Sequence, residues 1–153
     1  MQGSSTNDFA VSSKFAGTQN GAVYIYAGTT LTGTASVASS DLTLSGENAE
    51  RFGEDFAGGT SLFGSADGTL ALSDFNDDGN PDLVVGAPKR QDSTSTNRGG
   101  AYVFYGPLSA STTSASADVT FSGENTSFNR GVNAGNAVAF IGDMNDDGVT
   151  DLL

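Results

Sequence analysis

Short apolar runs separated by clusters of Gly, Asn, Asp and Ser recur along this 153-residue chain. Residues 82–88, Asp-Leu-Val-Val-Gly-Ala-Pro, are an example: a β-branched apolar run that ends at Gly and Pro. No stretch holds the apolar spacing of an amphipathic helix for long. The pattern predicts an all-β chain, and the length allows one domain or a piece of a larger one.

The apolar runs recur in the same order, which indicates an internal repeat. Residues 8–13 align with 82–87, and 151–153 begin the same pattern a third time; 21–26 align with 100–105, 41–48 with 118–125, and 69–73 with 138–142. Each repeat therefore predicts four short strands, an arrangement typical of propeller blades. We expect residues 8–81 to form the first repeat and 82–153 the second, with residues 1–7 a cloning remnant or a disordered tail.

Two nine-residue segments, 74–82 and 143–151, share Asp, Asn, Asp, Asp, Gly and Asp at positions 1, 3, 4, 5, 6 and 9. Ca²⁺ takes about six to eight oxygen ligands, and a tight turn can point alternate residues at one centre. We therefore predict two Ca²⁺ per chain. The expected ligands are the side chains at positions 1, 3, 5 and 9 and the backbone carbonyl at position 7: Asp74, Asn76, Asp78, Asn80 and Asp82, and Asp143, Asn145, Asp147, Val149 and Asp151.

The alternative to a metal loop is a polar turn whose side chains cap their own backbone. Recurrence disfavours it, because turn formation needs no acid at position 9. Eight of the eighteen acids lie in these segments, where without a cation they would repel one another. An EF-hand needs Glu at position 12 and flanking helices, but position 12 of the first loop is Val85, inside an apolar run. The loop is therefore expected to join two strands.

The motifs occur in a characteristic order: Phe-Gly, the acidic loop, Leu-Val-Val-Gly-Ala-Pro, and a strand that begins Gly-Ala. This order resembles the FG-GAP repeat of integrin α-subunit β-propellers and their bacterial relatives. Phe52-Gly53 or Phe63-Gly64 is the candidate Phe-Gly element of the first repeat, and residues 128–131 carry an interrupted version in the second. The resemblance implies four-stranded antiparallel blades, about two blade-equivalents in a permuted frame: strands 2–4, a whole blade, then strand 1 and the start of strand 2.

A propeller typically has about 4–8 blades, so two blade-equivalents cannot close a ring. A single copy would expose unpaired strand edges, which favour association. Two explanations remain open. The chain completes its ring with copies of itself, as a trimer or tetramer rather than a dimer, or it is a piece of a longer propeller.

The composition and charge of the chain disfavour several classes of function. The formal net charge is −12, and six Lys and Arg are too few to favour a nucleic-acid partner. The chain has no His and no Cys, the commonest general base and the strongest nucleophile, so we expect no enzyme activity. No segment is apolar enough to insert into a membrane. Weak calcium sites fill only outside the cell, which predicts an extracellular or cell-surface location.

The topology implied by the resemblance places all the basic residues in loops on the face opposite the calcium loops: Lys14, Arg51, Lys89, Arg90, Arg98 and Arg130. Glu50 and Glu54 share that face, and solvated charge for solubility is the simplest interpretation. Lys89, Arg90 and Arg98 flank a long loop and are candidates to bind an anionic ligand.

We expect a calcium-binding scaffold of structural or adhesion type, with a protein or glycan ligand. The alternatives are a ligand-free or engineered fragment and a non-catalytic appendage of a secreted hydrolase.

Overall fold

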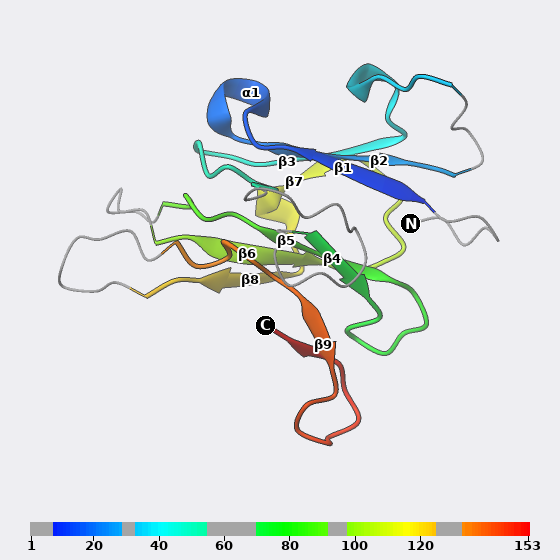
Figure 1. Cartoon of the computed structure of the whole chain (residues 1–153), viewed down its shortest axis with the longest axis vertical. Helices are drawn as coiled ribbons and strands as arrows, with labels where there is room; N and C mark the ends of the chain where they lie inside the picture. Colours follow the sequence, from blue (N-terminus) through cyan, green and yellow to red (C-terminus); the bar gives the residue numbers. More distant parts are fainter. Residues whose placement is uncertain (1–7, 29–32, 55–69, 92–97, 125–132) are drawn as a thin grey trace.

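A computed structural model describes residues 8–28, 33–54, 70–91, 98–124 and 133–153 (Figure 1). The predicted all-β class is confirmed: these residues form two four-stranded sheets and a two-stranded hairpin. The helical segments among them are short, α1 (Ala16–Gln19), η1 (Val37–Ser39) and η2 (Ser114–Ser116). The predictions for residues 1–7, Phe63-Gly64, Arg130 and 128–131 lie outside the described residues.

The first sheet has the strand order β1 (Phe9–Ser13), β2 (Ala22–Tyr26), β3 (Leu42–Ser45) and β7 (Thr112–Thr113). Its first three strands are antiparallel neighbours, as strands 2–4 of a blade would be. β7 instead pairs with β3 in parallel and comes from the connection between β6 and β8 of the other sheet. The sequence pattern did not predict this strand, because two Thr residues carry no apolar alternation.

The second sheet contains β4 (Leu70–Ser73), β5 (Asp82–Gly86), β6 (Gly100–Phe104) and β8 (Val119–Ser122). All neighbours are antiparallel and follow one another along the chain, the order expected of a blade. Beyond this sheet, β9 (Phe140–Gly142) and β10 (Asp151–Leu152) form the C-terminal hairpin.

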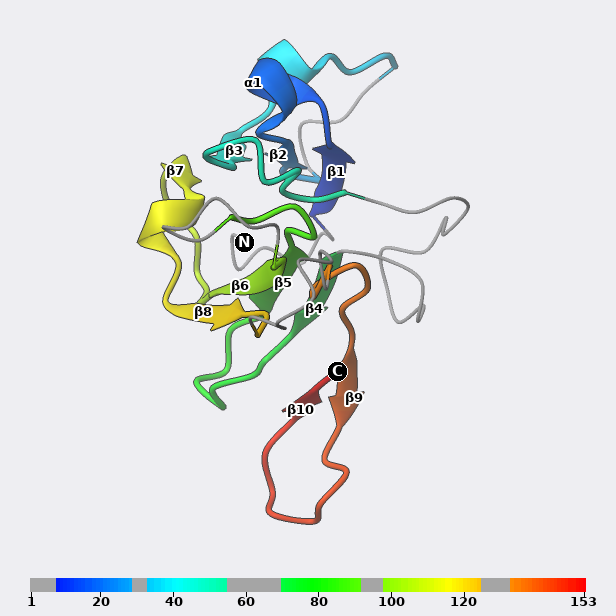
Figure 2. The same ribbon diagram turned by 90° about the vertical axis from the view of Figure 1, so that its left-hand side faces the viewer.

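The three β layers are stacked, with the second sheet in the middle (Figures 1 and 2). One apolar cluster lies between the two sheets; it includes Val23, Ile25, Leu44, Phe52, Leu83, Val85, Tyr102 and Phe104. The other lies between the second sheet and the hairpin; it includes Val84, Ala101, Val103, Phe140 and Leu152. Because alternate residues of a strand face opposite layers, every residue of β5 is buried.

The structure corrects the alignment of the third strand of the two repeats by one residue. Gly21 forms a parallel bridge with Phe52, and Gly99, rather than Gly100, forms the corresponding bridge with Ala134. Both glycines have positive φ, 83° and 71°, and a Cβ on either would lie within 2.4 Å of the bridged backbone. The sequence comparison was misled because Gly99 and Gly100 are adjacent and either can be matched to Gly21.

The same correspondence locates the Phe-Gly element. Phe52-Gly53 occupies it in the first sheet, with Gly53 at φ 72°. Its equivalent in the second repeat is Ala134-Gly135, with Gly135 at φ 74°. The aromatic residue is therefore replaced by Ala at the second corner, which is why the motif could not be found there by its letters.

Candidate functional site

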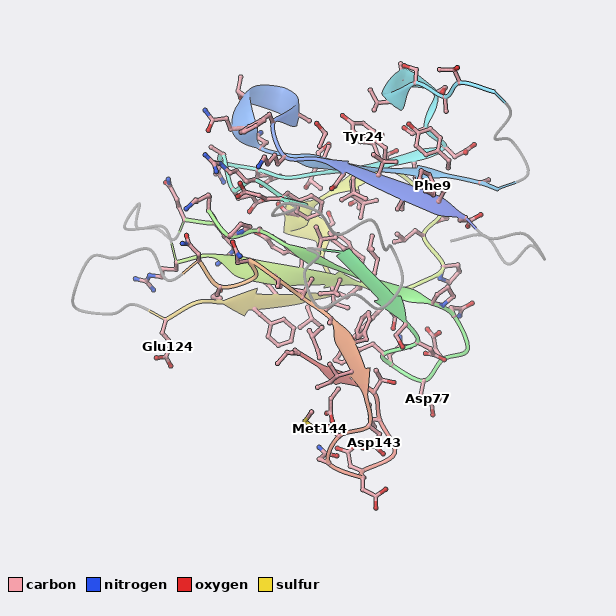
Figure 3. The ribbon with its side chains drawn as sticks, viewed as in Figure 1. Phe9, Tyr24, Asp77, Glu124, Asp143 and Met144 are labelled. Carbon is pink, nitrogen blue, oxygen red and sulfur yellow. The ribbon has the colours of Figure 1, made fainter. Side chains whose placement is uncertain are left out.

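The two acidic loops each join the first strand of a hairpin to the second, β4 to β5 and β9 to β10. Figure 3 shows Asp77, Asp143 and Met144 on these loops. The prediction that both loops join strands rather than helices is confirmed.

In the first loop, backbone N–H groups hold the acidic side chains in place. Asp74 accepts from Asp78 N (3.0 Å) through Oδ1 and from Gly79 N (2.9 Å) through Oδ2. The Oδ1 atom of Asn76 accepts from Asp78 N (3.1 Å), and the Oδ1 atom of Asp78 accepts from Asn80 N (2.8 Å). These bonds require a tight loop, and the backbone provides it with positive φ at positions 4 and 6.

The second loop repeats this arrangement bond for bond. Asp143 accepts from Asp147 N (3.0 Å) and Gly148 N (2.7 Å). Asn145 accepts from Asp147 N (3.0 Å), and Asp147 accepts from Val149 N (2.9 Å). The two loops differ in residue type at positions 2, 7 and 8 yet share one conformation.

The acid at position 9 has a structural role in both loops. Asp82 is fully buried; its Oδ2 accepts from Phe75 N (2.8 Å) and Asn76 N (3.2 Å), and its Oδ1 accepts from Gly106 N (2.9 Å). It therefore joins the start of the loop to the turn after β6. Asp151 accepts from Met144 N (2.7 Å), the equivalent of the bond to Phe75 N.

Asp78 is exposed and remains ionised at neutral pH. The backbone N–H of Asn80 and then the carboxamides of Asn76 and Asn80 hold the pKa of Asp78 below its ordinary value. A carboxylate that stays charged at an exposed loop tip is suited to a cation.

The predicted calcium ligands supply only oxygen atoms, the donor type that hard cations prefer. Within the described residues, no three His, Cys, Asp or Glu side chains are grouped closely enough to hold a metal ion. The carboxylates are instead held by the backbone N–H groups of their own loops. The calcium assignment therefore stays a prediction.

The predicted anion-binding residues bind groups of the chain itself. Lys89 Nζ donates to Asn133 Oδ1 (2.9 Å). Arg90 donates from Nε to the Tyr102 hydroxyl (2.9 Å) and from Nη1 to Ser122 Oγ (2.8 Å). Arg98 is half-buried, and its carbonyl accepts from the backbone N–H of the Phe-Gly-equivalent corner. The side chains of Lys89 and Arg90 thus have partners within the chain, and anion binding stays a prediction.

A polar cavity of about 210 Å³ lies where the two repeats meet; its lining includes Glu47, Glu50, Arg90, Tyr102 and Ser114. Glu50 is only 3% exposed and accepts from the hydroxyls of Tyr102 and Ser114, each at 2.5 Å, and from Glu47 N at 2.7 Å. Sequence reasoning placed Glu50 among exposed loop charges. No local signal marks it, because its partners lie 52 and 64 residues away.

Glu54 is a second buried acid at the same corner. Its Oε1 lies 2.9 Å from Arg51 Nη1 and 3.5 Å from Lys14 Nζ, and its Oε2 has no hydrogen-bond partner. Lys14 and Arg51 therefore pair within the first repeat. They are not free cations of a ligand-binding face.

Among the described residues, no helix is both long and apolar enough to cross a membrane.

Comparison with known proteins shows that the central part of the chain is similar to a known repeat family. Residues 66–104 match the FG-GAP repeat family. The chain is also 46% identical over 69 residues to a phosphatidylinositol-glycan-specific phospholipase D of Mus musculus, and 45% identical to the Rattus norvegicus protein of the same name. Each match covers 45% of this chain, which spans only 8% of the length of either relative. The antiparallel pairing of β4, β5 and β6 agrees with this match, and residues 66–104 of the chain are similar to an FG-GAP repeat.

Proposed function

We propose that this chain is a calcium-binding β-propeller module that works outside the cell as a structural, adhesion-type scaffold and completes its ring by self-association. The calcium assignment is based on one observation: the two loops have the same network of hydrogen bonds between backbone N–H groups and oxygen-bearing side chains. Positions 2, 7 and 8 vary, whereas the oxygen-bearing residues at positions 1, 3, 5 and 9 and the backbone bonds that orient them are the same. The two loops therefore share a set of side-chain oxygen atoms that the backbone holds in place.

Electrostatics supports a cation in each loop. In the described part of the chain, the ion pairs join Lys14 and Arg51 to Glu54, and none involves a loop acid. Four carboxylates in each nine-residue segment therefore repel one another without a nearby basic side chain. A bound Ca²⁺ would offset this repulsion through the carboxylate and carboxamide oxygens and the carbonyl at position 7.

Calorimetric titration with Ca²⁺ tests the assignment, and we expect two sites with dissociation constants of about 10⁻⁴–10⁻³ M, as in extracellular modules. Asp78→Asn should remove one site, because position 5 is a predicted carboxylate ligand. Asp77→Asn is the matched control: position 4 lies beside it, keeps its positive φ with Asn, and is not a predicted ligand. Unchanged stoichiometry in Asp78→Asn, or no heat at millimolar Ca²⁺, would rule out the assignment.

A second candidate function is supported by the comparisons: a non-catalytic module of a secreted hydrolase. The relatives are named as phospholipases, and the chain matches only a small part of each. If the module is non-catalytic, the purified chain should release no product from a phosphatidylinositol glycan, with a whole phospholipase as positive control. If the chain alone hydrolysed this substrate, the module would be catalytic and both proposed functions would be wrong on that point.

A further inference from the structure

The outer face of the first sheet is partly uncovered. Phe9 is 45% exposed and Val11 is 37% exposed, and the register places Tyr24 beside Val11 on the same face. Their equivalents in the second sheet are Leu83, Val85 and Tyr102, and all three are buried against the first sheet. In the second sheet, this face is therefore covered by a neighbouring sheet of the same kind.

The outer face of the second sheet is the complementary surface. The hairpin covers Val84, Ala101 and Val103, and Leu152 packs against that cluster. Phe121 lies opposite Ala101 on the same face and remains 45% exposed, beyond the reach of a two-stranded hairpin. A sheet with more strands would cover it. The chain thus carries both halves of one sheet-to-sheet contact.

The hairpin pairs irregularly where it should resemble the start of a blade. β4 and β5 pair through four successive residues without a shift, from Leu70 to Ser73. β9 and β10 pair at Asp151 with Gly142 and at Leu152 with Phe140, and the register shifts between these positions. Ala139 and Leu153 also exchange two backbone hydrogen bonds, of 2.9 and 2.8 Å. The pairing of β9 with β10 is therefore irregular where that of β4 with β5 is regular.

The start of β1 resembles the start of β5, which is the regular partner of β4. Asp8-Phe9 aligns with Asp82-Leu83 and with Asp151-Leu152. Asp8 Oδ1 accepts from Gly28 N at 3.3 Å, as Asp82 Oδ1 accepts from Gly106 N at 2.9 Å. The acid that ends a metal loop in the second sheet thus has an equivalent at the head of β1.

The geometry points to strand exchange between copies of this chain: β9 of one copy pairs with β1 of a second copy and displaces Asp151–Leu153. Phe9 of the incoming copy then replaces Leu152 against Val84 and Val103, and its sheet covers Phe121. This inference rests on the self-association in the proposed function and names the surfaces that carry it. The contact is heterologous, so repeated copies close into a ring when the rotation permits.

A pair of cysteines tests the contact, since the chain contains none of its own. The pairing of Leu70 with Val85 places Val11 of one copy opposite Ala139 of the other. Val11→Cys with Ala139→Cys should therefore form disulfide-linked multimers on oxidation. Within one chain β1 and β9 lie on opposite sides of the second sheet, so the link must join two copies (Figure 1). Val37→Cys with Ala139→Cys is the control, because Val37 is 50% exposed but belongs to η1 and not to the pairing strand β1.

Three further variants separate this contact from self-association in general. Phe9→Ala should weaken association about tenfold, whereas Val37→Ala should not change it. Deletion of 152–153 should leave association equal or stronger, because it removes most of the competing strand and keeps Asp151, a predicted calcium ligand. A tenfold loss of association affinity on this deletion would overturn the strand exchange. So would a chain that forms multimers in light scattering but gives no crosslink between Val11→Cys and Ala139→Cys. In both cases self-association itself would stand. A wild-type chain that stays monomeric in millimolar calcium overturns both.

Discussion

Tyr102 holds its proton more strongly than an ordinary tyrosine because it lies between the two sheets. Burial is the largest cause, followed by the hydrogen bond to Glu50 and the negative charge of that carboxylate, and together they raise the pKa of Tyr102 to about 12. The Arg90 guanidinium acts in the opposite direction but does not reverse the shift. Tyr102 therefore remains a hydrogen-bond donor to Glu50 at neutral pH.

The sign of the resulting pH dependence follows from this shift. In the unfolded chain the phenol ionises near its ordinary pKa of about 10, whereas in the folded chain it stays protonated until about pH 12. The stability that Tyr102 contributes is therefore complete below pH 10 and lost as the pH rises toward 12. Absorbance titration at alkaline pH should show one late-ionising tyrosine that disappears in Tyr102→Phe. A titration with every tyrosine near pH 10 would contradict the shift.

At the scale of elements, the acidic loops contain acids with two separate roles. Asp82 accepts three backbone N–H groups and is fully buried, so it holds the β4–β5 hairpin together with or without a cation. Asp78 is exposed and accepts only from residues of its own loop. Asp82 is also a predicted ligand, but its backbone bonds should contribute to stability without metal, whereas the contribution of Asp78 should depend on metal.

Chemical unfolding with and without chelator separates the two roles. Asp82→Ala should destabilise the chain by at least about 1–3 kcal/mol even in EDTA, because buried N–H groups lose their acceptor. Asp78→Ala should lower stability mainly when calcium is present, since its proposed role is as a ligand. If the two variants lost the same free energy in EDTA, the distinction between a structural and a metal-binding acid would be wrong.

At the scale of the whole molecule, the described residues cover the second sheet on one face with the first sheet and, in part, on the other face with the hairpin. The first sheet leaves Phe9 and Val11 exposed, and the hairpin leaves Phe121 exposed. Apolar surface of this kind, next to strand edges, favours association with a matching sheet. The proposed ring would cover both outer layers in the way the middle layer is already covered.

Calcium should control this assembly because one acidic loop lies in the hairpin that carries β9. Removal of the ion would leave the carboxylates of residues 143–151 repelling one another next to the contact strand. Light scattering should therefore show a multimer in millimolar calcium and a smaller species in EDTA. A mass that does not change with chelator would contradict the coupling of calcium to assembly.

The sequence determined the features that depend on local chemistry. Alternation of apolar residues between Gly- and Asp-rich turns is a property of neighbouring residues, so the all-β class and the strand-joining loops could be predicted. The oxygen-bearing positions of the loops are likewise local, although a bound ion is still a proposal.

Tertiary structure decided whatever depends on residues far apart in the chain. The register shows that Gly21 corresponds to Gly99, and that Ala134 stands where the first repeat has Phe52. The burial of Glu50 and the parallel pairing of β7 with β3 arise only when the two repeats pack together. These contacts are long-range, and single-sequence patterns record the neighbours of a residue along the chain, not its neighbours across an interface.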